Sequence, residues 1–153
     1  MPSVREYMDP DPVTVSPEAT LEEVARAIGE NELPGVPVVN AVGRVVGYVS
    51  ENDLVISDDE GDLHIPHYIE LFGGLIPLEP VHRFRERMKK AVATTADQMM
   101  TADPRTVGPD DDVREAAHAI VESGHNRIPV VEHGLLVGVI SRADVVRALE
   151  ASR

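Results

Sequence analysis

The amino-acid sequence contains no cysteine among its 153 residues. Disulfide bonds, zinc sites with thiolate ligands and a cysteine nucleophile are therefore excluded. No apolar run approaches the roughly 20 residues that a transmembrane helix needs, and residues 1–6 lack the apolar stretch of a signal peptide. The sequence therefore predicts a soluble, cytoplasmic protein that does not enter a membrane.

Positive charge is also scarce, with 14 Lys and Arg against 27 Asp and Glu and a formal net charge of −13. Because binding to a phosphate backbone requires an excess of basic residues, this charge disfavours nucleic-acid binding. No Ser-His-Asp, P-loop or Gly-x-Gly-x-x-Gly pattern stands in a suitable context. We therefore assign no catalytic residue and no cofactor.

What the sequence does contain is an internal repeat. Residues 12–39 align with residues 104–131 at an offset of 92, and residues 47–54 align with residues 138–145 at an offset of 91. Two copies are too few for a solenoid, and each copy alone is too small to bury a sufficient core. The repeat therefore predicts a pseudo-symmetric pair in which each half covers the apolar face of the other.

Each half is expected to fold as β-α-β-β-α. In the first half, residues 13–15 form the leading strand, residues 18–31 carry apolar side chains at helical spacing behind a Ser16-Pro17 cap, and residues 36–39 and 45–49 form a hairpin. The second half repeats this order with a helix at 110–122, a hairpin ending at Ile140 and a final helix from Ser141. In that last helix, Val145, Val146 and Leu149 are expected to face inward.

The predicted fold class is thus α/β (α+β), with two pseudo-symmetric repeats packed through their sheets. The predicted organisation is a first repeat at 1–54, an insert at 55–98 and a second repeat at 99–153.

The order of motifs resembles a known family. In the second half, a strand ending in Thr106-Val107 precedes a helix, the segment Gly124 to Val131 (Gly-His-Asn-Arg-Ile-Pro-Val-Val), a hairpin, and the segment Gly138 to Asp144 (Gly-Val-Ile-Ser-Arg-Ala-Asp). This order is similar to the cystathionine-β-synthase (CBS) domain, and its two copies resemble the tandem pair called a Bateman module. The resemblance implies a regulatory ligand sensor without catalysis that binds AMP, ADP, ATP or S-adenosylmethionine between its halves and forms a homodimer.

The second half supplies the groups that an adenine nucleotide needs. Asp144 can accept both ribose hydroxyls, Ser141 precedes free helix amides that suit a phosphate, and Arg127 offers a forked cationic donor. The expected walls around adenine are Val107, Ile128 and Pro129, and the resemblance adds Thr106 and Asn126. The Ser-x-x-Asp motif is also typical of a capping box at a helix start, and the two roles are compatible.

The first half keeps fewer of these groups, namely Thr14, Val36, Pro37, Ser50 and Asp53. Gly35 stands where the second half has Arg127, so we expect this cleft to hold a phosphate poorly.

The insert carries apolar side chains at Ile65, Tyr68, Ile69 and Phe72, a spacing that predicts a helix ended by Gly73-Gly74. We expect this helix to form a subunit or interdomain contact. A second helix is expected from Val81 to Val92, with a basic exposed face. His64 and His67 lack a fixed third ligand, so the alternative of a metal-dependent hydrolase has weak support and no metal site is assigned.

The sequence thus favours a non-enzymatic, regulatory CBS-domain pair that binds an adenosine-type small molecule and signals to an unidentified effector protein. The alternative is a structural dimerisation scaffold whose clefts are vestigial.

Overall fold

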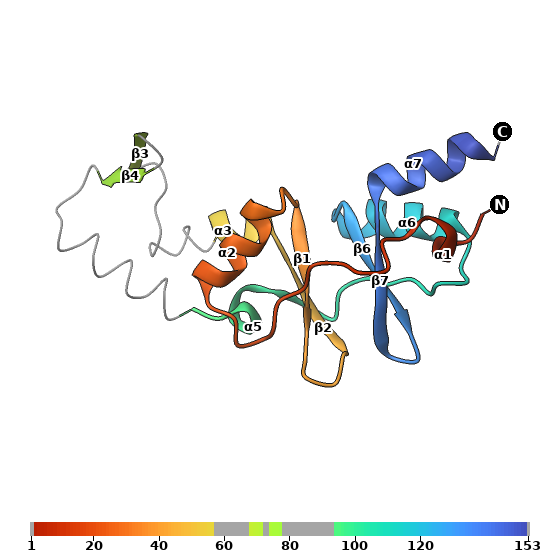
Figure 1. The fold of residues 1–153 in the computed structure, drawn as a ribbon, viewed down its shortest axis with the longest axis horizontal. Helices are drawn as coiled ribbons and strands as arrows, with labels where there is room; N and C mark the ends of the chain where they lie inside the picture. The colour runs from red at the N-terminus through yellow and green to blue at the C-terminus, as the bar shows by residue number, and fades with distance from the viewer. Residues whose placement is uncertain (1, 57–67, 72–73, 78–93, 153) are drawn as a thin grey trace.

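The computed structural model describes residues 2–56, 68–71, 74–77 and 94–152 (Figure 1). The helices are α1 (Val4–Tyr7), α2 (Leu21–Glu30), α3 (Glu51–Ile56), α5 (Ala96–Met99), α6 (Val113–Ser123) and α7 (Arg142–Ala151). The strands are β1 (Gly35–Val39), β2 (Val45–Ser50), β3 (Tyr68–Leu71), β4 (Gly74–Pro77), β5 (Thr101–Ala102), β6 (Arg127–Glu132) and β7 (Leu135–Ser141).

Two antiparallel hairpins form the centre of the molecule, β1 with β2 and β6 with β7. Their registers are equivalent, since Val36 faces Val49 in the first and Ile128 faces Ile140 in the second. Each hairpin also has an irregularity at the same place, after Val38 and after Val130. The predicted fold class and its two pseudo-symmetric repeats are confirmed.

The leading strand of each half is shorter than expected. It is reduced to one parallel bridge, from Val15 to Val38 in the first half and from Val107 to Val130 in the second.

The long helix of each half begins later than the sequence suggested. α2 starts at Leu21 and is capped by Thr20, whose hydroxyl accepts a hydrogen bond from the amide of Glu23 at 3.2 Å. The expected Ser16-Pro17 cap is wrong because Pro17 and Glu18 form a turn, which leaves Thr20 as the polar side chain next to the free amides. In the second half, Asp112 caps α6 in the same way.

The inward face of α7 agrees with the prediction at Val145 but differs from it at Val146 and Leu149. Val145 and Ala148 are buried, whereas Val146 is 55% and Leu149 is 40% exposed. The buried pair is three residues apart, so it forms one stripe, and α7 packs against α6 through this stripe. A small alanine is suited to that place because it lets two helices approach closely.

The two repeats exchange their first helices (Figure 1). Val4 of α1 is fully buried in the core of the second repeat, and its amide donates to the carbonyl of Asp111 at 2.8 Å. Ala96 of α5 is fully buried in the core of the first repeat, where its amide donates to the carbonyl of Ala19 at 2.8 Å. The repeat therefore extends back to residues 3 and 95, and each half contributes to the core of the other. The repeat boundaries expected from the sequence, at residues 54 and 99, remain a prediction.

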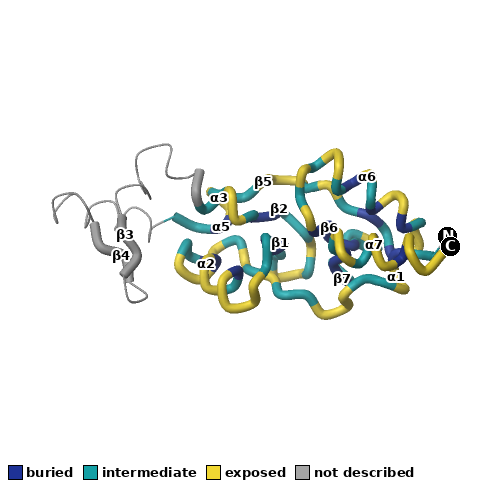
Figure 2. Tube along the Cα trace, turned by 90° about the horizontal axis from the view of Figure 1, so that it is seen from above, coloured by how far each residue is buried: buried dark blue, intermediate teal, exposed yellow. Residues whose placement is uncertain are grey.

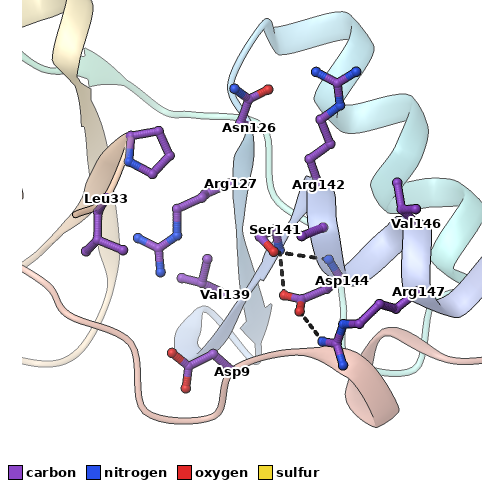
Figure 3. Close-up of a pocket in the computed structure, with 12 residues that line it drawn as sticks. Asp9, Leu33, Asn126, Arg127, Val139, Ser141, Arg142, Asp144, Val146 and Arg147 are labelled. Atoms are coloured by element: carbon purple, nitrogen blue, oxygen red, sulfur yellow. Dashed lines mark hydrogen bonds and ion pairs between the residues drawn. The ribbon is translucent and has the colours of Figure 1, made fainter. Parts of the chain in front are cut away.

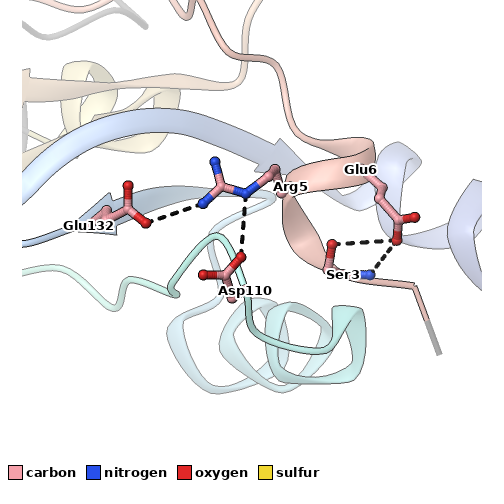
Figure 4. A network of polar contacts seen from close by, with 5 residues as sticks. All are labelled: Ser3, Arg5, Glu6, Asp110 and Glu132. Carbon is pink, nitrogen blue, oxygen red and sulfur yellow. Dashed lines mark hydrogen bonds and ion pairs between the residues drawn. The ribbon is translucent and has the colours of Figure 1, made fainter.

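The N-terminal segment is also tied to the second repeat by polar contacts (Figure 4). The Nε of Arg5 lies 3.3 Å from Asp110, and its Nη2 lies 3.2 Å from Glu132. These side chains are solvent-exposed, so the ion pairs contribute little, and burial of Val4 dominates the attachment. Figure 2 shows that buried residues follow the hairpins and the inner faces of the helices, while the loops are exposed.

Residues 68–71, within the segment predicted as a helix at 65–72, form strand β3 instead. This strand pairs with β4 so that Ile69 faces Ile76. The backbone groups of β3 and β4 bond to each other, and this pairing competes with a helix. Residues 78–93, with the predicted basic helix, and His64 and His67 lie outside the described residues.

Candidate functional site

A cleft of about 840 Å³ lies between the repeats, at the junction of β6, β7 and the start of α7 (Figure 3). This volume is within the usual range for small-molecule sites. The lining residues come from the N-terminal segment, the first repeat and the second repeat. They are Asp9, Leu33, Pro34, Asn126, Arg127, Val139, Ser141, Arg142, Ala143, Asp144, Val146 and Arg147.

Ser141 and Asp144 form a capping box at the start of α7. The amide of Ser141 donates to Oδ2 of Asp144 at 2.9 Å, and the amide of Asp144 donates to the hydroxyl of Ser141 at 3.1 Å. The other carboxylate oxygen of Asp144 is ion-paired with Arg147 (Figure 3). A carboxylate has about four lone-pair sites, so Asp144, whose side chain is 18% exposed, keeps acceptor capacity toward the cleft. The capping role is thus shown, and it leaves room for a second one.

Arg127 is the one buried charged residue in the described part of the chain, with 7% exposure. Its Nη1 donates to the carbonyl of Gly35 in the first repeat at 2.8 Å. A guanidinium has five N–H donors, and this is its one hydrogen bond among the described residues. Burial lowers the pKa of Arg127, and the nearby Tyr48, Asp9 and Asp144 oppose this shift. Arginine stays protonated in such a setting, so a cation with unused donors borders the cleft.

Two further arginines line the cleft. The guanidinium of Arg147 lies over the ring of Tyr7 at 5.8 Å and pairs with Asp144. Arg142 is exposed and makes no side-chain hydrogen bond or ion pair with any described residue. In Figure 3 it points away from Asp144, on the same side as Asn126. Three arginines against two aspartates make this cleft locally positive in a chain of net charge −13.

The structure brings together four of the predicted residues of the second half, Asn126, Arg127, Ser141 and Asp144. Val107 and Ile128 are 5% and 1% exposed and lie in the core, Pro129 is also buried, and none of the three lines the cleft. Successive residues of a strand point to opposite faces, so Ile128 enters the core while Arg127 borders the cleft.

The apolar wall comes instead from Leu33, Pro34, Val139, Ala143 and Val146. Thr106 lies elsewhere, in a separate hollow beside Arg44.

The residues predicted for the first half are dispersed. Ser50 and Asp53 form a box similar to that of the second half, since the amide of Ser50 donates to Oδ2 of Asp53 at 2.8 Å. Ser50 borders a small hollow of about 190 Å³. Val36 and Pro37 are buried and Thr14 is exposed, and none of them lines a described hollow of this half.

Tyr48 and His125 lie in that small hollow with ring centroids 4.5 Å apart. Burial raises the pKa of Tyr48 to about 12, although the neighbouring Arg127 opposes this shift. Burial also lowers the pKa of His125, against the effect of Asp53. Both side chains are therefore uncharged at neutral pH.

Sequence reasoning missed several cleft residues, above all Asp9, Leu33 and Arg142. Arg142 could have been found, because it follows Ser141 directly at a helix start. Asp9 could have been found only by extending the repeat toward the N-terminus, where Asp9 aligns with Thr101 at the same offset of 92 residues.

Two interlocked α/β repeats with a cleft between them define a tandem domain pair. A family model described as the CBS domain matches residues 4–60 and 96–151. The chain therefore belongs to the CBS-domain family and contains two copies of the domain.

Relatives at the sequence level include the uncharacterized protein MJ1426 of Methanocaldococcus jannaschii, which is 31% identical over 146 residues, 90% of this chain and 86% of that protein. The chloroplastic CBS domain-containing protein CBSX1 of Arabidopsis thaliana is 30% identical over 88% of this chain. The chain spans only 57% of CBSX1.

Two solved structures share the fold. The structure of CBSX2 in complex with AMP has a TM-score of 0.72 and 24% identity, and covers 99% of this chain and 98% of that one. The CBS domain pair of MJ0100, in complex with 5′-methylthioadenosine and S-adenosylmethionine, has a TM-score of 0.72 and 16% identity, and covers 100% of this chain and 99% of that one.

Among the described residues, none of the helices has the length and apolar character to span a bilayer. The same part of the chain has no group of three or more His, Asp or Glu side chains arranged to hold a metal ion.

Proposed function

We propose that the protein is a non-enzymatic regulatory module that binds an adenosine-containing ligand in the 840 Å³ cleft. The observation that carries this proposal is Arg127, a buried cation with one hydrogen bond and unused donors at the edge of the cleft. Leaving buried donors without a partner is costly, and a phosphate would satisfy them with charge-assisted hydrogen bonds.

The remaining groups suit the other parts of an adenine nucleotide. Asp144 would accept the ribose hydroxyls with its free lone pairs, while Leu33, Pro34 and Val139 would enclose the base. Arg142, which has no partner among the described side chains, would meet a phosphate at the Asn126 side. AMP, ADP and ATP fit these groups, and S-adenosylmethionine shares the adenosine part. The fold relatives in complex with AMP and with S-adenosylmethionine support this ligand class.

The cleft is suited to regulation because it is lined by both repeats and by the N-terminal segment. A ligand there would stabilise one arrangement of these parts over others, which is the requirement for an allosteric signal. We propose that an effector protein reads this change.

We further propose that the protein is a homodimer. Val121 of α6 is 82% exposed, and Val146 and Leu149 of α7 are 55% and 40% exposed. Covering these apolar side chains with a second copy would remove them from water. Sedimentation velocity at micromolar concentration should give a dimer, and a monomer alone would contradict this part of the proposal.

A second candidate is a dimerisation scaffold with vestigial clefts. The 190 Å³ hollow of the first half favours it, because that volume is too small for a nucleotide. The two candidates differ in whether the larger cleft binds anything.

A thermal-shift screen with AMP, ADP, ATP, S-adenosylmethionine and NAD distinguishes them. A ligand at 100 times its dissociation constant should stabilise the folded protein by about 2.7 kcal/mol. We expect a shift with at least one adenosine compound and none with the matched cytidine nucleotide. No shift with any adenosine compound would favour the scaffold.

A further inference from the structure

The small hollow of the first half is the symmetry counterpart of the large cleft. The repeat offsets of 92 and 91 map its lining onto cleft residues at every position but Gly124. Ser50 maps to Ser141, Glu51 to Arg142, and Pro34 to Asn126. The two spaces nevertheless differ in volume, about 190 Å³ against about 840 Å³.

Two aromatic side chains of the small hollow occupy positions that aliphatic side chains hold in the open cleft. Tyr48 stands where the open cleft has Val139, and His125 stands where it has Leu33. Tyr48 is 1% exposed, and its ring lies 4.5 Å from that of His125 at an interplanar angle of 33°. The pair fills space that aliphatic side chains leave open on the other side of the molecule.

Gly35 makes room for this arrangement. A Cβ atom at Gly35 would lie 2.5 Å from the hydroxyl oxygen of Tyr48 and 2.6 Å from the carbonyl oxygen of Val49, which is too close for any side chain. Gly35 is also the symmetry mate of Arg127, and its carbonyl accepts the hydrogen bond from that guanidinium. Tyr48 in its present position is therefore compatible only with glycine at residue 35.

We propose that Tyr48 and His125 form an intramolecular plug that occupies the first adenosine site, so that the chain binds one ligand and not two. This inference rests on the proposed function of the larger cleft. The plugged site retains the Ser50 and Asp53 box, with the Ser50 amide 2.8 Å from Asp53. It has Gly35 and Glu51 where the open cleft has Arg127 and Arg142, so once opened it should accept uncharged adenosine.

The test removes the plug by copying the open cleft. Titration calorimetry with adenosine should give one site per chain for the natural protein and two for the double variant Tyr48→Val/His125→Leu. The matched control is Tyr48→Phe, which keeps the ring and should keep one site. Circular dichroism and thermal unfolding establish that each variant is folded, and the milder Tyr48→Leu replaces the double variant if it does not fold.

The outcomes separate the plug from the proposed function. Two adenosine sites in the natural protein would overturn the plug, as would one site in a folded plug-free variant when the natural protein also has one. If the natural protein binds neither adenosine nor AMP, the function proposed for the large cleft fails. In that case, binding by the plug-free variant alone would still support the plug, and no binding by either protein would overturn both.

Discussion

Replacing Asp144 by Asn separates the two roles of this carboxylate. In the folded protein Oδ2 accepts the amide of Ser141 at 2.9 Å, and the other oxygen pairs with Arg147. Asparagine keeps the size and one acceptor oxygen but loses the charge and the second acceptor. The hydrogen bond to Ser141 can therefore persist, whereas the contact with Arg147 and a bidentate contact with a ribose cannot.

The magnitudes follow from these contacts. Asn is itself a good capping residue, so the loss of stability should stay near the lower end of the roughly 0.5 to 2 kcal/mol that a lost cap costs. The ion pair with Arg147, whose side chain is 63% exposed, adds little. Ligand affinity should fall at least tenfold, which corresponds to about 1.4 kcal/mol.

Titration calorimetry with AMP and urea unfolding without ligand measure the two effects. Asp53→Asn is the matched control, because Asp53 accepts hydrogen bonds from the amide and hydroxyl of Ser50 at the start of α3 but belongs to the half whose site is plugged. We expect a similar loss of stability in both variants and a loss of AMP affinity in Asp144→Asn alone. Unchanged AMP affinity in folded Asp144→Asn would refute the assignment of Asp144 to the ribose.

Three further predictions concern other parts of the chain. Arg127→Ala should weaken AMP at least tenfold more than adenosine, because only AMP offers a phosphate; equal losses in calorimetry would mean that Arg127 acts through Gly35 alone. Because the pKa of Tyr48 is about 12 in the folded protein, the unfolded chain loses the phenol proton at a lower pH than the folded protein does. The free energy of unfolding should therefore be unaffected by this group below about pH 10 and should decrease by roughly 2 to 3 kcal/mol between about pH 10 and pH 12. Tyr48→Phe should remove that part of the pH dependence in urea unfolding, and an unchanged profile would contradict it. Val4→Ala should lower the free energy of unfolding by about 2 kcal/mol, because Val4 is fully buried in the second repeat. Val42→Ala, at a site that is 67% exposed, should lower it by almost nothing. Equal losses in the two variants would contradict the exchange of first helices.

The parts of the fold that sequence predicted well are those set by local pattern. The hairpins were located because β-branched runs recur at a constant offset, and each run pairs within its own repeat. The final helix was also located, but its inner face was not. Val146 and Leu149 are more apolar than Ala148, yet close packing of α7 on α6 selects the small residue. The hydrophobicity of the residues alone does not indicate how closely the two helices pack.

The exchange of α1 and α5 could not be predicted from periodicity. Each of these helices has only four residues and one fully buried side chain, so neither has an apolar stripe. Their positions depend on contacts with residues about 100 positions away in sequence, such as that between Val4 and Asp111. Asp9 reaches the cleft through a similar long-range contact, the backbone bridge with Val139.

The sequence predicted four polar residues of the candidate site, but it missed the apolar wall and the charged residues Asp9, Arg142 and Arg147. Asn126, Arg127, Ser141 and Asp144 stand in motifs, whereas Leu33 and Pro34 reach the cleft from the other repeat. The inequality of the two halves was expected from Gly35. The exchange of Val139 for Tyr48 was visible at aligned positions, but its effect on volume requires the packed structure.

A crystal structure with the adenosine compound that gives the largest thermal shift tests the central claim most directly. We expect one ligand per chain, with its ribose on Asp144, its base against Val139, and any phosphate on Arg127. Tyr48 and His125 should still fill the first site. A ligand bound outside the cleft, or in the cleft without contact to Asp144 and Arg127, would contradict the proposed function.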